Sequence, residues 1–544
     1  MNQGGTTDKV FYSSLTEGIF CQGRFFYSFV RKAKELLGGK NMKISTTLND
    51  VEKIVADGKY DVLPVSCEIL SDFITPIEAM KKLKNVSKHC YMLESAQADE
   101  TWGRYTFLGF DPIMEITCIG GTTDGVLEAG KLKYVTGNPS KYIREVLSQY
   151  KSPRFDDLPP FTGGLVGYFS FDFLGYSEPS VRVEVEDNEK FRDVDLMLFD
   201  KVIAFDNIRQ KIILIVNMQL DEPETNYNKA VWELKQIESL LRTGEKKNEP
   251  GGVLQGEVTA LFSKEQYCEM VEKAKNYIHE GDIFQIVLSN CLSAPFEGSL
   301  LNTYRVLRTI NPSPYMFYFS GTDVEVAGAS PETLVKLDNG VLHTFPLAGT
   351  RPRGRTAEED KALEAELLCD EKYGAYNITQ GDEKELAEHN MLVDLGRNDL
   401  GKISKFGSVQ VEKLHSIERF SHVMHIGSTV RGDIMENKDA LDAIEAVLPA
   451  GTLSGAPKIR ACQLIGELEN NKRGIYGGAI GYIDFTGNMD TCIAIRIAYK
   501  KNGKVFVRSG AGIVADSVPE KEYEECLNKA RSSLKALELA QEEL

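Results

Sequence analysis

The segment SKEQYCEMVEKAKNYIHEGDIFQIVLSN, residues 263–290, indicates the fold class because a helical pattern passes directly into a strand-like one. Ser263 and Gln266 can form a capping box at the start of the helix, and Gly281 supplies its stop. The following DIFQIVLSN is typical of a strand. Beyond it, strands and helices alternate irregularly to the end of the chain, which predicts an α+β protein.

A second α+β unit is predicted upstream, between about residues 64 and 241. We expect a helix near 76–84, strands at VIAFD (202–206) and KIILIVNM (211–218), and a helix over 226–241. Between the two units, TGEKKNEPGGVLQGE concentrates Gly, Pro and charge with almost no apolar anchor, which is typical of a linker.

The folded chain is expected to start at Met42, where Ser45, Thr46 or Thr47 could cap a first helix. We interpret residues 1–41 as a poorly ordered leader or a mis-assigned start, because they contain no signal peptide. The sequence therefore predicts an N-terminal domain at 42–242, a linker at 243–257 and a C-terminal domain at 258–544.

The composition is acidic and globular. The 544 residues include 63 Lys and Arg against 80 Asp and Glu, a net charge of −17, which argues against nucleic acid or an anionic membrane as the partner. No apolar stretch approaches the roughly 20 residues of a membrane span. The ten Cys are scattered without a CxxC pair, which favours reduced thiols in a cytoplasmic enzyme over disulfides or a zinc site.

Several common catalytic signatures are missing from the sequence. It contains no Walker A loop, no GxGxxG after a strand, no HExxH and no Gly-x-Ser-x-Gly or Gly-x-Cys-x-Gly elbow. Five glycine-rich loops nevertheless lie in the C-terminal half: PLAGTRPRG, DLGRND, PAGTLSGAPK, RGIYGGAIGY and SGAGIVADS. Such glycines usually mark close approach of a backbone to a ligand, so these loops indicate a binding site built from backbone amides.

Two predicted helices each carry a pair of carboxylates three residues apart, Glu385 with Glu388 and Glu522 with Glu525. Residues at this spacing share one helix face, and paired carboxylates suit Mg²⁺, although such faces are more often simply solvated. Arg496, placed in the apolar string CIAIRIAY that is expected to be a strand, needs an anionic partner. His425 falls in another strand-like string and on its own is more often structural than catalytic. These residues point to a metal-assisted enzyme acting on a small carboxylate.

The same strings resemble the chorismate-utilising enzymes and, among them, the large subunits of anthranilate synthases. The matches cover nearly all of 263–535 and, more thinly, 60–240. They read LES, GRYTFLG, GDIFQIVLS, NPSPYMFY, ASPE, PLAGTRPRG, EKELAEHNMLVDLGRND, SHVMHIGSTV, PAGTLSGAPK, RGIYGGAIGY, IRIA, GAGIVADS and EYEECLNKA. The resemblance implies large antiparallel sheets packed as a sandwich, with surrounding helices.

The resemblance also implies the roles of individual residues. Mg²⁺ would be bound by Glu388 and Glu525, with Glu385 and Glu522 beside them or acting through water. Glu332 would be the general acid near the C4 hydroxyl of chorismate, and His425 would act when the C2 proton is removed. The positions implied for substrate binding or for active-site loops are Gly349, Thr350, Thr452, Tyr476, Arg496, Gly510, Ala511 and Gly512.

Two positions distinguish members of the family. Water-using relatives carry a Lys base where this chain has Gln285, which cannot deprotonate water, and this favours ammonia as the nucleophile. Relatives that form a covalent adduct carry a Lys where this chain has Ala348, so amination at C2 is favoured. The resemblance thus implies that chorismate and ammonia give anthranilate and pyruvate, the first step of tryptophan biosynthesis.

Regulation and partners follow from the same resemblance. Ser95, Pro314, Tyr315 and Met316 match a tryptophan feedback site. Because the chain lacks a glutamine amidotransferase signature, a separate small subunit would deliver ammonia from glutamine, commonly in a heterotetramer. Two alternatives remain open: an enzyme that stops at aminodeoxyisochorismate, as in phenazine-type pathways, and a non-catalytic tryptophan-sensing homologue.

Overall fold

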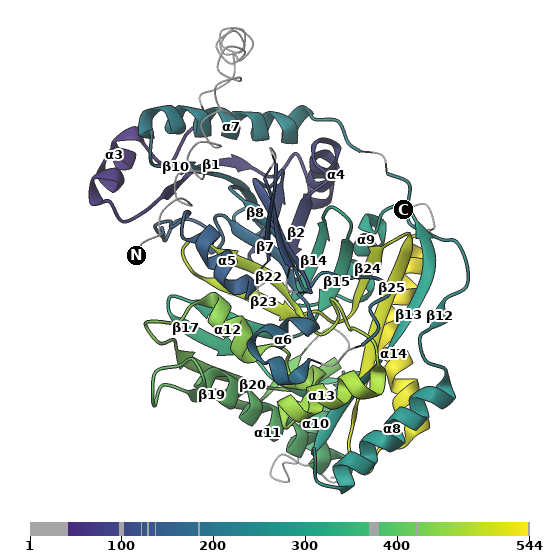
Figure 1. The fold of residues 1–544 in the computed structure, drawn as a ribbon. Helices are drawn as coiled ribbons and strands as arrows, with labels where there is room; N and C mark the ends of the chain where they lie inside the picture. Colours follow the sequence, from purple (N-terminus) through teal and green to yellow (C-terminus); the bar gives the residue numbers. More distant parts are fainter. Residues whose placement is uncertain are drawn as a thin grey trace, which may run out of the picture.

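The computed structural model describes residues 42–96, 103–120, 122–127, 130–135, 138–182, 185–247, 249–368, 380–419 and 423–541. The predicted leader, 1–41, lies outside these residues. Two large antiparallel sheets pack against each other and helices surround them, so the predicted fold class is confirmed (Figure 1). In the described part of the chain, no helix is both long and apolar enough to span a membrane.

The first sheet joins strands that are far apart in the sequence. Its order is β1 (Val62–Leu70), β10 (Lys211–Gln219), β9 (Lys201–Asp206), β3 (Tyr105–Phe110), β2 (Cys90–Glu94), β14 (Tyr315–Ser320), β15 (Glu325–Ser330), β24 (Ile497–Lys501), β25 (Lys504–Ile513), β13 (Gln285–Glu297) and β11 (Val253–Leu254). Two short strands, β12 (Thr259–Ala260) and β21 (Gly455–Ala456), also pair with β13.

The second sheet is similarly mixed. Its order is β18 (Leu347–Pro352), β20 (Val423–Asp433), β17 (Val341–Thr344), β16 (Thr333–Asp338), β23 (Met489–Ile493), β22 (Ala479–Asp484), β7 (Gly164–Phe169), β8 (Val194–Phe199), β4 (Met114–Ile119), β5 (Thr122–Leu127) and β6 (Gly130–Val135), and β19 (Gln410–Arg419) pairs with β20. Both sheets thus contain strands from either side of the predicted linker, and the domain boundary stays a prediction.

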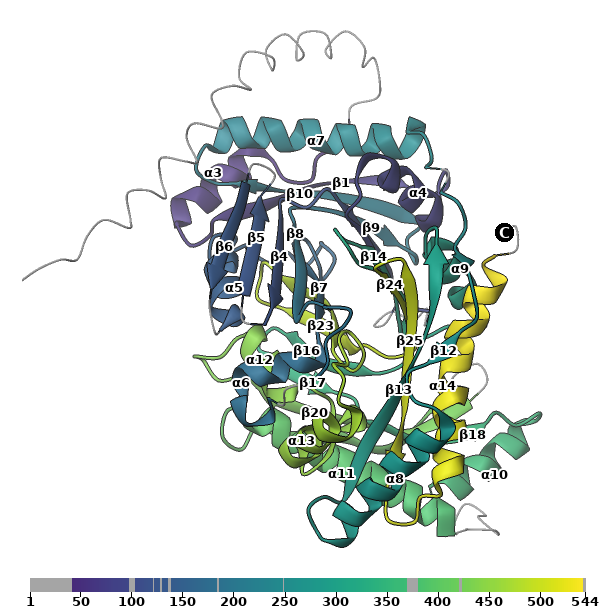
Figure 2. The same ribbon diagram turned by 45° about the vertical axis from the view of Figure 1, so that its right-hand side comes forward.

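The helices cover the outer faces of the sheets. Their bounds are α3 (Leu48–Asp57), α4 (Pro76–Val86), α5 (Pro139–Leu147), α6 (Leu174–Ser177), α7 (Pro223–Thr243), α8 (Lys264–His279), α9 (Leu301–Ile310), α10 (Ala357–Leu367), α11 (Gln380–Gly401), α12 (Ala440–Val447), α13 (Lys458–Glu469) and α14 (Pro519–Leu539), with 3₁₀ turns η1 (Phe171–Phe173), η2 (Pro179–Val181) and η4 (Gly451–Leu453). In Figure 2, α7 crosses the top of the molecule and α14 runs beside β25.

Aromatic side chains fill the space between the sheets. Tyr91, Phe107, Phe161 and Phe199 are buried there, and the Tyr91 ring meets the Phe199 ring edge-on with centroids 4.7 Å apart. Aromatic rings bury a large apolar area and favour this edge-to-face contact. This aromatic layer holds the two sheets in a fixed relative position. Side chains from one sheet that meet side chains from the other therefore also have fixed positions.

The predicted helix starts are confirmed in atomic detail. Thr47 caps α3 and Ser263 caps α8, each in a capping box, and both helices begin at the next residue. The strand predicted at 211–218 is confirmed as β10. The described cysteines form no disulfide, in agreement with their scattered positions.

The placement of Arg496 within a strand is wrong. The apolar string CIAIRIAY is broken into β23 and β24, which belong to different sheets, and residues 494–496 cross between them. Arg496 occupies the bend with φ 52°, a left-handed conformation that is costly for a residue with a Cβ. The crossover leaves the guanidinium at the junction of the two sheets instead of in a strand face.

Candidate active site

A cavity of about 760 Å³ lies where the two sheets, α11 and α14 converge. Most of the predicted catalytic and binding positions line it: Gln285, Glu332, Ala348, Gly349, Glu388, His425, Thr452, Tyr476, Arg496, Gly510, Gly512, Glu522 and Glu525. Ala511 points into the core on the other face of β25, as strand alternation requires. The side chains of Thr350 and Glu385 lie outside the described residues.

Glu332 is a carboxyl group with few polar neighbours. Its side chain is 9% exposed, and the Thr452 hydroxyl donates to its two oxygens at 3.3 Å each. Burial raises the pKa of Glu332 to about 8, although the Thr452 bond and the charge of Arg496 act in the opposite direction. At neutral pH this carboxyl group is therefore mostly protonated and can donate a proton.

Arg496 faces the same space as a largely buried cation. Burial lowers the pKa of its guanidinium, while the nearby Glu332 raises it. Among the described residues, Arg496 forms no ion pair within 4.0 Å of a carboxylate. A buried guanidinium of this kind is suited to bind the carboxylate of a ligand in a bidentate arrangement.

His425, on β20, has a defined orientation. Its Nδ1 donates to the carbonyl oxygen of Gly349 at 2.9 Å, so the neutral ring carries its basic lone pair on Nε2. Burial lowers the pKa of His425 and outweighs the bond to Gly349, which acts in the opposite direction, and the charge of Arg496 lowers the pKa further. The ring is consequently neutral at pH 7 and able to accept a proton.

Carboxylates from two helices face the cavity. Glu388 is on α11, whereas Glu522 and Glu525 are on the first turns of α14, three residues apart as predicted. Gln285 Nε2 donates to Glu388 Oε1 at 3.0 Å, and Lys529 pairs with Glu525 at 2.8 Å. The amide of Gln285 therefore orients a carboxylate rather than providing a base.

The carboxylates fit Mg²⁺ in donor chemistry. Within the described residues, no group of three or more His, Cys, Asp or Glu side chains is close enough together to hold a metal ion. Mg²⁺ commonly uses only one or two protein carboxylates and keeps several waters. Glu388 and Glu525, on two helices that border one cavity, match that requirement.

The glycines of SGAGIVADS allow the cavity wall to be flat. A Cβ on Gly510 would lie 2.6 Å from the Leu288 carbonyl oxygen, and one on Gly512 would lie 2.8 Å from Gln285 Nε2. Both distances are too short for real Cβ contacts, so a side chain at either position would displace β13 or Gln285. Glycine thus keeps the backbone of β25 open to a ligand.

Two charged residues that line the cavity, Arg508 and Lys529, were not predicted from the sequence. Arg508 is buried in the apolar strand β25, so the argument applied to Arg496 could have found it. Its Nη2 donates to Glu469 at 3.1 Å and its Nη1 to the Lys472 carbonyl oxygen at 2.8 Å. Lys529 lies four residues after Glu525, the spacing of a helical ion pair.

The four residues of the predicted tryptophan site also come together. Ser95, Pro314, Tyr315 and Met316 line a separate cavity of about 260 Å³, which we call the Ser95 cavity. Strands β2 and β14 pair there with Met316 opposite Glu94, and the Ala96 N–H donates to the Ser313 carbonyl oxygen at 3.0 Å. Two strings separated by more than 200 residues therefore form one wall.

Comparisons with known proteins agree with this geometry. Residues 88–535 match a family model described as chorismate binding enzyme. The chain is 46% identical over 510 residues to "Anthranilate synthase component 1" of Acetivibrio thermocellus, covering 91% of this chain and 99% of that protein. The corresponding protein of Aquifex aeolicus is 44% identical, with 92% and 99% covered. A crystal structure of anthranilate synthase component I from Streptococcus pneumoniae superposes with a TM-score of 0.69 at 36% identity, covering 86% of this chain and 98% of that one.

Proposed function

The chain belongs to the chorismate-binding enzyme family, in its anthranilate synthase component 1 branch, and from that premise we propose the reaction that it catalyses. Chorismate and ammonia would give anthranilate, pyruvate and water, with Mg²⁺ as cofactor, as a carbon-oxygen lyase reaction. The observation that carries the proposal is the cavity itself, because it combines a protonated carboxyl, a neutral imidazole, an anion-binding guanidinium and paired carboxylates.

The first chemical step needs an acid at the C4 hydroxyl of chorismate. Glu332 would donate a proton so that the hydroxyl leaves as water while ammonia forms a bond to C2. A carboxyl with its pKa near 8 is suited to this role at neutral pH, because it is still protonated there yet loses its proton readily.

The second step needs a base at C2. His425 Nε2 would accept the C2 proton as the enolpyruvyl group leaves as pyruvate, and the ring becomes aromatic. The Gly349 carbonyl oxygen fixes the required tautomer by accepting from Nδ1. Since burial lowers its pKa, His425 remains unprotonated and available at neutral pH.

Substrate charge would be matched by residues of both sheets. Arg496 and the open backbone at Gly510 and Gly512 would bind carboxylate oxygens of chorismate. Glu388 and Glu525 would hold Mg²⁺, with Glu385 and Glu522 adjacent, and the bound ion would act as a Lewis acid toward the ring carboxylate. A bound cation would also add to Lys529 in offsetting the charge of these carboxylates beside an anionic substrate.

Ammonia is favoured over water by Gln285. Its amide is not a base, and its Nε2 is committed to Glu388. Ammonia needs no deprotonation before it attacks. We further propose that a separate amidotransferase subunit supplies this ammonia from glutamine, and that tryptophan inhibits the enzyme from the Ser95 cavity.

Product analysis tests the proposal. The purified chain is incubated with chorismate, Mg²⁺ and an ammonium salt, and separately with glutamine in place of ammonium; anthranilate fluorescence and pyruvate are measured. We expect both products with ammonium and neither with glutamine. Accumulation of aminodeoxyisochorismate or of isochorismate, without anthranilate, would refute the proposed reaction.

A further inference from the structure

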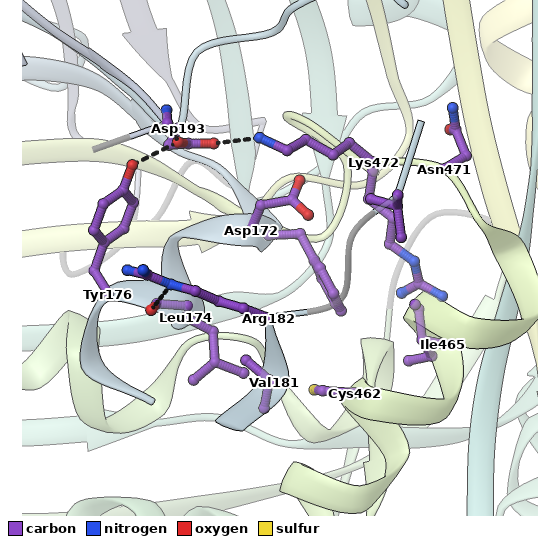
Figure 3. Close-up of a pocket in the computed structure, with 16 residues that line it drawn as sticks. Asp172, Leu174, Tyr176, Val181, Arg182, Asp193, Cys462, Ile465, Asn471 and Lys472 are labelled. Atoms are coloured by element: carbon purple, nitrogen blue, oxygen red, sulfur yellow. Dashed lines mark hydrogen bonds and ion pairs between the residues drawn. The ribbon is translucent and has the colours of Figure 1, made fainter. Parts of the chain in front are cut away.

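A third cavity, of about 310 Å³, lies outside the site described above. Its walls come from η1, α6, η2, the middle of α13 and residues 471–473. Figure 3 shows its two-sided character: Asp193, Tyr176 and Lys472 are joined on one side, while Leu174, Val181, Cys462 and Ile465 gather on the other. We call it the Asp172 cavity, after the carboxylate between these two sides.

Most of its charged groups already have partners. Asp193 accepts from the Tyr176 hydroxyl at 2.6 Å and from the Gly120 N–H at 2.9 Å, and it pairs with Lys472 at 3.4 Å. Arg473 donates to Glu469, to the Leu453 carbonyl oxygen and to the Val287 carbonyl oxygen. None of these groups has much capacity left for a ligand.

Asp172 and Arg182 differ from them. Asp172 Oδ2 accepts one bond, from the Gly474 N–H at 3.1 Å, and no cation lies within 4.0 Å of this carboxylate in the described residues. Burial raises the pKa of Asp172 to about 6, although the charge of Lys472 acts in the opposite direction, and a ligand cation in contact with the carboxylate would stabilise its charged form. The charge of Lys472 acts on Asp172 from beyond 4.0 Å, so the site offers a negative group without a direct ion pair.

Arg182 supplies the opposite charge. Its Nε donates to the Gly175 carbonyl oxygen at 2.6 Å, and its guanidinium lies 5.3 Å from the centroid of the Tyr176 ring. No described carboxylate lies within 4.0 Å of it, so its terminal nitrogens can donate to an anion. A purely cationic or purely anionic ligand would satisfy only one of the two groups.

The remaining surface of the Asp172 cavity favours a ligand with an apolar side chain. Leu174, Val181, Cys462 and Ile465 contribute aliphatic or thiol surface. Phe171 also lines the cavity, and the Arg473 guanidinium lies 4.5 Å from the centroid of its ring. A small volume with one apolar side and two opposite charges is complementary to a compact amphiphilic zwitterion.

We propose that the Asp172 cavity binds a free α-amino acid with an apolar side chain. The ammonium group contacts Asp172, the carboxylate contacts Arg182, and the side chain packs against Leu174, Val181, Cys462 and Ile465. The cavity is separate from the Ser95 cavity. It lies directly behind the active site, since Arg473 lines it and also bonds to the backbone of Val287 and Leu453 in the active-site wall.

The test is calorimetric titration of the full chain with L-leucine, L-methionine and L-phenylalanine, without chorismate or Mg²⁺. At least one should bind. Three analogues of leucine each lack one of its groups: glycine lacks the side chain, 3-methylbutylamine lacks the carboxylate and 4-methylpentanoate lacks the amine. Each analogue should bind about 10-fold more weakly than leucine, or worse. Absence of binding by all three amino acids at millimolar concentration, or equal binding of the single-charge analogues, would overturn the proposal.

Variants locate the ligand. Asp172→Asn and Arg182→Gln should each weaken binding by about 10-fold or more, whereas Asp157→Asn, at an exposed carboxylate outside the cavity, should not. Arg182 is exposed, so its variant remains informative if Asp172→Asn does not fold. Binding that survives both changes, or that is lost in Ser95→Phe, would place the ligand elsewhere and refute the inference. Because no substrate is present, this result is independent of the proposed reaction.

Discussion

The active-site cavity and the Ser95 cavity lie between the same two sheets, but one buried carboxyl group of each, Glu332 and Glu94, is partnered in opposite ways. In the active-site cavity, Glu332 is a carboxyl that burial leaves without an adjacent counter-ion, and its pKa rises to about 8. In the Ser95 cavity, Glu94 pairs with Arg308 at 2.5 Å and accepts from the Tyr304 hydroxyl at 2.5 Å. Burial without a partner makes a group ready for proton transfer, whereas burial with partners makes it rigid.

The difference is consistent with the proposal that one cavity carries out chemistry and the other recognises an inhibitor. Tyr315 in the Ser95 cavity is held by Thr333 and by Asp490 at 2.8 Å each, so its hydroxyl shapes the wall. Substitutions in the active-site cavity should therefore change turnover, and substitutions in the Ser95 cavity should change only inhibition. Four substitutions test this division, in order of decreasing effect.

Glu332→Gln should have the largest effect. The amide cannot donate a proton as an acid, so kcat/KM for chorismate should fall by about 10²- to 10⁴-fold. Gln has the same shape and can still accept from Thr452, so the melting temperature should stay close to that of the parent. Near-normal turnover in this variant would refute the general-acid assignment.

Glu525→Gln should reduce Mg²⁺-dependent turnover by about 100-fold, because one proposed ligand loses its charge. Glu524→Gln is the matched control, since Glu524 is exposed on the same helix and does not line the cavity. Turnover is measured across a range of Mg²⁺ concentrations. Full activity of Glu525→Gln at saturating Mg²⁺ would contradict the ligand assignment.

Ser95→Phe should leave turnover within about 2-fold of the parent and raise the tryptophan inhibition constant by more than about 10-fold, because the ring fills the cavity. Ser95→Ala adds no bulk and should weaken inhibition less. Initial rates with and without tryptophan give both constants. Unchanged sensitivity of Ser95→Phe would remove the regulatory role from this cavity.

Thr452→Val should have the smallest effect. The Thr452 hydroxyl donates to the Glu332 carboxyl and thereby stabilises its charged form, so removing this bond should raise the pKa of Glu332 further. The alkaline limb of the kcat/KM profile should then move upward by up to about 1 in pH. A downward movement would show that the hydroxyl does not act on Glu332.

Local sequence rules predicted much of the site. Helix periodicity placed Glu522 and Glu525 on one face of α14, and capping chemistry located the starts of α3 and α8. Strand alternation placed His425 correctly on β20. These features depend on neighbours within about one helical turn, and the sequence contains all of the required information.

Features that depend on long-range packing were not predictable in the same way. Arg496 was placed in a strand because no Gly or Pro interrupts CIAIRIAY, yet the chain changes sheets there. The Asp172 cavity was not anticipated, since its walls come mainly from residues 171–182 and 462–473, which are distant in sequence. The resemblance to a known family, rather than periodicity, brought Ser95 and Met316 together.

The pH dependence of kcat/KM for chorismate tests the central claim most directly, namely that burial keeps Glu332 protonated for catalysis. It is measured with saturating Mg²⁺ and a constant concentration of unprotonated NH₃, so that ammonia ionisation does not contribute. We expect kcat/KM to be steady near neutral pH and to fall above about pH 8, where Glu332 loses its proton, and we expect no such fall in Glu332→Gln. The claim would be contradicted if kcat/KM had already fallen completely near the ordinary pKa of a carboxyl group. It would also be contradicted if the decrease at alkaline pH persisted in Glu332→Gln.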